Sequence, residues 1–168
     1  MSAGRFFKKE KGFTYIGLMI AVAMTGAGLA AYGEFASHAA LREKEAELLF
    51  RGNQYREAIA SYYKKEKRYP QSLEQLLKDP RYPMPVHHLR KLYPDPMTGA
   101  ADWALIKAPE GGIMGVHSRS EEAPIKTGNF AARDAALAEA PRDPESTGPR
   151  YADWKFFHRP SAPGAKPG

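Results

Sequence analysis

The chain of 168 residues has no cysteine, no proline before Pro70 and no charged residue from Phe13 to Gly33. Without cysteine there are no disulfides and no thiolate metal sites, while the redox compartment stays open. Without proline, a helix can continue through the first 69 residues. The uncharged stretch is 21 residues long in a chain whose mean hydropathy is −0.54, so its environment must differ from that of the polar remainder.

The positive charge of the chain belongs partly to its first residues. Residues 1–12 carry four Lys or Arg and one Glu, a net +3 out of a total of +6. In the remainder, Lys and Arg alternate with acidic residues along the sequence, as they do on a solvated surface. This pattern does not favour nucleic acid as a partner, although residues 13–168 retain a charge of +3.

A helix over residues 13–33 would be about 30 Å long at roughly 1.5 Å per residue, which matches the hydrocarbon core of a bilayer. Three interpretations compete for this segment. A Sec signal peptide has a shorter apolar stretch and a small-residue cleavage site at its far end. A permanent membrane anchor explains the length and the basic flank, and the positive-inside rule then places the N-terminus in the cytoplasm. The third interpretation depends on the junction between the basic head and the apolar stretch.

That junction is Gly12-Phe13, preceded by the lysines at positions 8, 9 and 11. It resembles the N-terminal segment of type IV pilin-like proteins, which include the pseudopilins of type II secretion. In that family a prepilin peptidase cuts after the glycine and methylates the new N-terminal residue. The resemblance implies a leader of residues 1–12, cleavage between Gly12 and Phe13, and N-methylation of Phe13.

The resemblance also implies a location, a set of partners and a mechanical function. The precursor would be a single-pass inner-membrane protein with a cytoplasmic N-terminus and a periplasmic C-terminal domain. Its partners would be the prepilin peptidase, other pilin-like subunits and the inner-membrane assembly platform. The mature chain would assemble through its N-terminal helix into a periplasmic filament, as a homo- or hetero-polymer. An assembly ATPase outside this chain would drive extraction from the membrane.

The composition of residues 13–33 is weakly apolar and rich in small side chains. Six residues are Phe, Ile, Leu or Val, which favour insertion by only roughly 2–4 kcal/mol in total, while nine are Gly or Ala. Gly17 and Ala21, like Gly26 and Ala30, have the spacing that lets helices approach closely. An ordinary Ala-rich anchor has a similar composition. The sequence predicts helix packing through these four residues in a filament core.

Gly17 is also a departure from the family pattern, because pilin-like proteins usually carry a glutamate at this position. In the family that carboxylate is thought to pair with the N-terminal amine of a neighbouring subunit. Its absence resembles the minor subunits at a filament tip, but a divergent subfamily could pair the amine differently. Glu34 cannot replace it, because 17 residues further along a helix is about 25 Å away.

Residues 34–67 are predicted to continue the same helix as an amphipathic half. Ala, Glu, Lys, Leu and Arg dominate the composition, and these are strong helix formers. One stripe at helical spacing collects Leu41, Glu45, Leu48, Gly52, Tyr55, Ile59 and Tyr62, and Leu49, Ala58 and Tyr63 widen it. A juxtamembrane coiled coil is the alternative, but Glu45 and Gly52 interrupt its pattern. Packing against a small sheet fits better.

Residues 68–158 are predicted to form a small α+β region. A short helix follows Pro70 and ends near Lys78, and residues 79–99 are rich in turns. Two β-type runs, 103–108 and 113–118, flank Pro109-Glu110-Gly111-Gly112 and predict a hairpin. Residues 151–157 could add a strand, and the tail 159–168 is predicted to be disordered. The expected fold class is α+β: a long N-terminal helix packed on a small antiparallel sheet, as in pilins.

No motif of a catalytic or nucleotide-binding site is present, so the sequence does not predict an enzyme. His87-His88 is the only histidine pair, and adjacent side chains rarely converge on one metal ion. Asp95 and Asp102 flank a turn; the related secretion pseudopilins often bind calcium in a C-terminal loop, but the run is not a calcium-loop pattern. No cofactor is therefore predicted, and calcium stays open without a motif to support it. Trp103 and Trp154 are expected in the core.

Two further interpretations differ from the filament subunit in class. One is an unprocessed single-pass, membrane-anchored periplasmic adaptor or binding protein. The other is a DNA-uptake pseudopilin, which would require an exposed basic patch on the mature chain. The sequence identifies neither the secreted cargo nor the secretion or pilus system, and it leaves open whether the subunit is abundant or sits at a tip.

Overall fold

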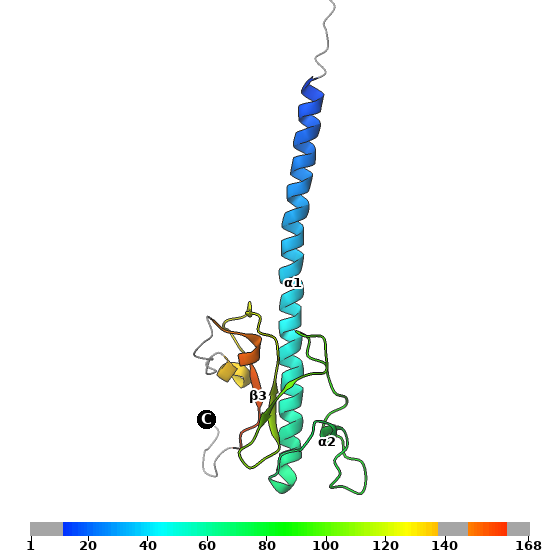
Figure 1. The fold of residues 1–168 in the computed structure, drawn as a ribbon, viewed down its shortest axis with the longest axis vertical. Helices are drawn as coiled ribbons and strands as arrows, with labels where there is room; N and C mark the ends of the chain where they lie inside the picture. The colour runs from blue at the N-terminus through cyan, green and yellow to red at the C-terminus, as the bar shows by residue number, and fades with distance from the viewer. Residues whose placement is uncertain (1–11, 138–147, 161–168) are drawn as a thin grey trace, which may run out of the picture. The chain divides into compact units, whose positions relative to one another are not determined.

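The computed structural model describes residues 12–137 and 148–160 of the chain (Figure 1). It divides into two units, residues 1–40 and residues 41–168, and the second is called the folded unit below. The predicted leader lies almost wholly outside the described residues, as does the predicted tail from residue 161 onward. The segment before the third strand is described only up to residue 137 and again from residue 148.

Helix α1 spans Gly12–Glu66, within a residue of the predicted 13–67 at each end. It ends where Lys67 adopts a φ of 56°, in the left-handed region that commonly closes helices. The N–H of Lys67 donates to the carbonyl of Tyr63 at 2.9 Å, which satisfies one of the last carbonyls of the helix. Lys64 and Lys65 lie in the last turn, where positive charge is favourable.

In the first unit, the described residues form the N-terminal part of α1 and nothing else. This N-terminal segment, residues 12–40, exposes its large apolar side chains by more than half. They are Tyr15, Ile16, Leu18, Met19, Ile20, Val22, Met24, Tyr32 and Phe35. A contiguous apolar surface of this kind is typical of a site of association.

The location that was predicted for the chain is contradicted. Among the described residues, no helix combines the length and the apolar character that crossing a membrane requires, so the single-pass inner-membrane location with a periplasmic domain is wrong. The physical reason lies in the composition: nine of the 21 residues from 13 to 33 are Gly or Ala, which contribute little apolar surface.

The folded unit contains a three-stranded antiparallel sheet in the order β1-β2-β3. Strands β1 (Ala104–Lys107) and β2 (Ile113–His117) form the predicted hairpin, and β3 (Lys155–Phe157) pairs with β2. The turn of the hairpin requires Gly111 and Gly112, whose φ values are 92° and 84°. A Cβ at Gly112 would also lie 2.7 Å from the Cβ of Tyr69, so glycine is needed there for space as well.

The core lies between the sheet and one face of α1 (Figure 1). The predicted stripe is confirmed, because its members from Glu45 to Tyr62 are buried and Leu41, Leu49 and Tyr63 are partly buried. Gly52 permits the closest approach: a Cβ there would meet the Phe156 ring at 2.4 Å. Trp103 and Trp154 are buried in this core, as predicted.

Three short helices also belong to the described part of the folded unit. Helix α2 (Glu74–Leu77) buries Leu76 and is shorter than the predicted helix that follows Pro70. The 3-10 helices η1 (Ala132–Leu137) and η2 (Tyr151–Asp153) bury Leu137 and Tyr151. The fold class is therefore α+β, with a long helix against a small antiparallel sheet, as expected.

Candidate functional site

The predicted assembly residues all lie on the N-terminal segment of α1. A Cβ added at Gly17 or at Gly26 would meet no atom within 4 Å, so both glycines border open space. Ala21 is exposed, and its carbonyl accepts a hydrogen bond from the Thr25 hydroxyl at 2.8 Å. Ala30 belongs to the helix, but its side chain lies outside the described part of the chain. Gly17, Ala21 and Gly26 are thus not covered by any described side chain.

The predicted cleavage junction lies at the start of α1. The helix begins at Gly12, and the side chain of Phe13 is outside the described residues. No acidic residue lies in the first turn, so nothing in that turn neutralises the positive end of the helix dipole. Both residues of the junction belong to the first turn of α1 as the structure describes it.

His87 and His88, the only histidine pair, point to different partners. A ring nitrogen of His87 contacts the carbonyl of Leu77. In His88, Nδ1 lies 2.9 Å from the Ser61 hydroxyl and Nε2 lies 3.2 Å from Oδ2 of Asp79. Within the described residues, no three His, Cys, Asp or Glu side chains come together around a point where a metal ion could bind.

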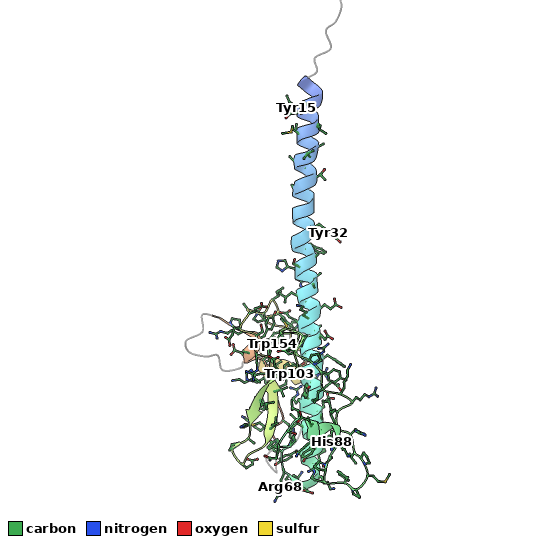
Figure 2. The ribbon with its side chains drawn as sticks, turned by 45° about the vertical axis from the view of Figure 1, so that its right-hand side comes forward. Tyr15, Tyr32, Arg68, His88, Trp103 and Trp154 are labelled. Carbon is green, nitrogen blue, oxygen red and sulfur yellow. The ribbon has the colours of Figure 1, made fainter. Side chains whose placement is uncertain are left out.

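Ser61, His88 and Asp79 form a chain of hydrogen bonds with the order of a serine-hydrolase triad. Asp79 is an acceptor, so Nε2 of His88 donates to it, while Nδ1 shares a hydrogen bond with the serine hydroxyl. Ser61, however, lies inside α1, where neighbouring N–H groups are engaged in the helix and none is left to stabilise an oxyanion. The arrangement therefore links helix and loop rather than supporting nucleophilic catalysis. His88 is labelled in Figure 2.

Asp79 is the centre of the polar cluster around this chain. Its side chain is fully buried, and Arg81 donates to it from Nε at 2.8 Å and from Nη2 at 2.6 Å. The hydrogen bonds from Arg81 lower the pKa of Asp79 strongly, and burial opposes them only in part. Arg81 also donates to the carbonyl of Tyr62 at 2.9 Å and lies 3.6 Å over its ring. The pair therefore fastens the loop after α2 to the end of α1.

The aspartates that were considered for calcium are occupied by hydrogen-bond donors. Asp95 is fully buried and accepts from the N–H of Met97 at 2.9 Å and from the Ser118 hydroxyl at 2.6 Å. Asp102 accepts from the Thr98 hydroxyl at 2.8 Å. These donors already satisfy the buried carboxylate of Asp95. The two aspartates therefore stabilise a turn, and Asp95 ties that turn to the residue after strand β2.

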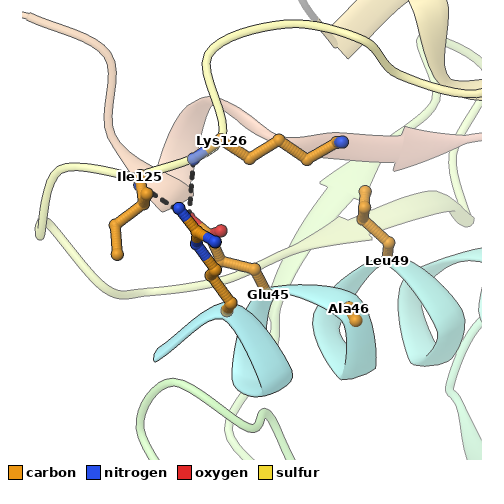
Figure 3. Close-up of a pocket in the computed structure, with 6 residues that line it drawn as sticks. Glu45, Ala46, Leu49, Ile125 and Lys126 are labelled. Atoms are coloured by element: carbon orange, nitrogen blue, oxygen red, sulfur yellow. Dashed lines mark hydrogen bonds between the residues drawn. The ribbon is translucent and has the colours of Figure 1, made fainter. Parts of the chain in front are cut away.

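Glu45 was the polar exception in the predicted apolar stripe, and the structure gives it a role. One carboxylate oxygen accepts from the N–H groups of Ile125 and Lys126, at 2.7 and 3.1 Å (Figure 3). The same oxygen accepts from the Tyr151 hydroxyl at 2.9 Å. Burial and this hydrogen bond raise the pKa of Tyr151. A hollow of about 360 Å³ opens beside Glu45, lined by Arg42, Ala46, Leu49, Ile125 and Lys126 as well. The carboxylate satisfies the donors of a loop that has no strand partner.

Sequence reasoning identified the stripe, the hairpin and the core tryptophans, but it did not predict the polar clusters around Asp79 and Glu45. The only signal in the sequence was Glu45, an acidic residue at a core-facing helix position. Such a residue predicts a buried hydrogen-bond acceptor, but the sequence does not show which groups donate to it. No family model, no curated protein and no solved structure matches this chain. The functional inference therefore depends on the residues and geometry described above.

Proposed function

We propose that this chain is a pilin-like subunit, a pseudopilin of a type II secretion or related type IV pilus system. A prepilin peptidase removes residues 1–12, and the mature chain assembles into a filament through its N-terminal helix. The proposal rests on the Gly12-Phe13 junction at the start of helix α1. Between this junction and residue 40, the helix exposes every large apolar side chain that the structure describes.

This helix would gain stability from partners, and its small residues would let them pack closely. Each large apolar side chain buried by a neighbour contributes on the order of 1.5–3 kcal/mol, so exposed residues from Tyr15 to Phe35 favour association. Small residues at Gly17, Ala21 and Gly26 allow neighbouring helices to approach. The folded unit, with its own core, would then remain outside the helix bundle. A pilin-like fold is part of this proposal, and it is compatible with the α+β class.

The decisive experiment measures the intact mass of the full chain made with and without an active prepilin peptidase. We expect loss of residues 1–12 and gain of one methyl group only when the peptidase is present. Electron microscopy and sedimentation of the processed chain should then show filaments. A chain that keeps residues 1–12 beside an active peptidase contradicts the proposal, and a processed chain that never associates contradicts its assembly step.

Two matched variants locate the cut. Gly12→Glu should block processing, because a charged side chain replaces the glycine at the junction, while the folded unit keeps its circular dichroism spectrum. Gly4→Glu introduces the same change in the head away from the junction and should be processed normally. Normal cleavage of Gly12→Glu at the same bond would show that the junction is wrongly assigned.

A further inference from the structure

Five exposed cations from three separate parts of the sequence lie at one end of the folded unit. Lys64, Lys67 and Arg68 come from the end of α1, Lys107 from the end of β1 and Arg159 from the residues after β3. These five residues are called the basic end. Arg68 is labelled in Figure 2, at the end of the folded unit.

Hydrogen bonds explain why these segments meet. The N–H of Ile113 donates to the carbonyl of Pro70 at 2.7 Å, which ties the hairpin to the segment after α1. The Tyr69 hydroxyl donates to the carbonyl of His158 at 2.9 Å, which ties the same segment to the end of β3. Burial lowers the pKa of His158, and the positive charges of Lys64 and Lys67 lower it further. The segments that carry the five cations therefore meet around Tyr69 and His158.

Two hollows lie within the basic end and share Tyr69 and Glu110 in their walls. One, of about 510 Å³, is lined by Lys67 and Arg68. The other, of about 370 Å³, is lined by Lys107 and Arg159. Cations thus flank two adjoining concave surfaces.

The basic end carries most of the charge excess in the described part of the folded unit. Residues 41–137 and 148–160 contain 19 Lys or Arg and 14 Asp or Glu, an excess of five positive charges. The five cations of the basic end, together with Glu110, which lines both hollows, account for four of these charges. Charges that alternate with acids along the sequence are therefore gathered by the fold at one place.

The five cations are also free to bind an anion. Among the described residues, none of them makes an ion pair with a carboxylate, whereas Arg51, Arg56, Arg81, Arg133 and Arg150 all do. Lys67 lies 5.8 Å from the centre of the Tyr63 ring, and Arg159 lies 5.4 Å from that of Phe157. These ring contacts leave the charged groups exposed to solvent.

We propose that the basic end binds the phosphate backbone of nucleic acid. Several unpaired cations around a concave surface can pair with phosphates by charge, and such contacts need no base-specific groups. A protein partner would be expected to contact an apolar or aromatic centre, and a lipid surface to receive apolar anchors. Tyr69, the aromatic residue that lines both hollows, is only 5% exposed, and the exposed large apolar residues of the folded unit, Phe50, Met84 and Leu105, line neither hollow. The inference concerns the folded unit and is independent of processing and filament assembly.

The test measures binding of the full-length chain to a fluorescently labelled DNA duplex by anisotropy over a series of salt concentrations. If three to five phosphates are contacted, the logarithm of the association constant should fall with the logarithm of salt with a slope of about −3 to −4. The double variant Lys67→Glu with Arg68→Glu should weaken binding by at least tenfold and reduce the steepness of the slope by about 2. Its circular dichroism spectrum should be unchanged, because both side chains are exposed.

The matched control is Arg90→Glu with Lys91→Glu, an exposed neighbouring pair that lines neither hollow and changes the net charge equally. It should bind at least five times more tightly than the first double variant. Glu110→Gln removes the acid that lines both hollows and should strengthen binding. Equal loss in both double variants would show an effect of net charge alone and overturn the proposal. Absence of binding at low salt, or stronger binding to vesicles with anionic headgroups or to polyglutamate than to DNA, would also overturn it.

Discussion

At the scale of single residues, Asp79 and Arg81 connect a loop to the end of α1 through one buried ion pair. Both partners are largely withdrawn from water, and the carboxylate receives several donors from Arg81 and one from His88. Removing one member of a buried pair leaves an uncompensated charge, which costs more than the pair contributes when both are present. The consequences for pH follow from the lowered pKa of Asp79.

We therefore expect Arg81→Met to lower the free energy of unfolding by about 3 kcal/mol at pH 7. The folded pKa of Asp79 lies below its unfolded value near 3.9, so the stabilisation is present above that value and is lost as the pH falls below it. The variant should consequently lose less stability than the parent between pH 5 and pH 2. Urea unfolding followed by tryptophan fluorescence at several pH values measures both effects.

An exposed ion pair provides the control for this prediction. Arg133 and Glu57 are 3.6 Å apart, with about three fifths of each side chain exposed. Glu57→Gln should change the free energy of unfolding by less than about 1 kcal/mol, because water screens the pair. If Arg81→Met were as mild as Glu57→Gln, the buried pair would not hold the loop in solution.

Gly52 is a second residue whose substitution should change the stability, because an added Cβ would clash with the core. It faces the fully buried ring of Phe156 across the interface between helix and sheet. Gly52→Ala should improve helix propensity by about 1 kcal/mol but force the ring to shift, at about 1–3 kcal/mol or more. We expect net destabilisation in thermal unfolding. Gly128→Ala, where a Cβ meets nothing within 4 Å, should be close to neutral and serves as the control.

At the scale of elements, α1 combines two surfaces of opposite character in one helix. From Leu48 onward, its buried stripe meets a sheet within the same chain. In the N-terminal segment, apolar residues are exposed around the helix and glycines border open space. The proposed assembly therefore predicts that changes in this segment alter association without altering the core.

Gly26→Ala tests that separation directly. In the isolated chain it should raise helicity slightly, because alanine is the better helix former by about 1 kcal/mol and no described atom opposes the added methyl group. In the filament it should reduce assembly, because the methyl group separates closely packed helices. Sedimentation of the processed chain measures the yield. Gly28→Ala, which lies outside the predicted spacing, should assemble nearly normally, and an equal effect of both would contradict the packing assignment.

The elements that sequence patterns predicted are those with local signals. The stripe from Leu41 to Tyr62 repeats at helical spacing, and the hairpin has two glycines between β-type runs, so both could be located before the structure. The positions of Asp134 and Asn53 could not, because their hydrogen bond at 3.0 Å joins residues 81 positions apart. The basic end was missed for the same reason. Contacts between distant segments leave no periodic trace in one sequence.

At the scale of the whole molecule, the two units differ in what stabilises them. Every buried apolar residue of the core lies between Leu48 and Phe156, so the described core draws nothing from residues 12–40. The first unit instead exposes its apolar surface. Stability and association should therefore be separable properties of this chain, carried by different residues.

A chain that begins at residue 36 tests this separation, since it keeps one helical turn ahead of Leu41. We expect its free energy of unfolding to match that of the full chain within about 1 kcal/mol, because no core contact is removed. Urea unfolding followed by fluorescence of the buried Trp103 and Trp154 measures it. It should also stay monomeric in sedimentation where the full chain associates, because the exposed apolar residues are gone. A large loss of stability would show that the N-terminal segment packs on the folded unit. Persistent association would place the self-contact on the folded unit and remove the helix from the proposed filament interface.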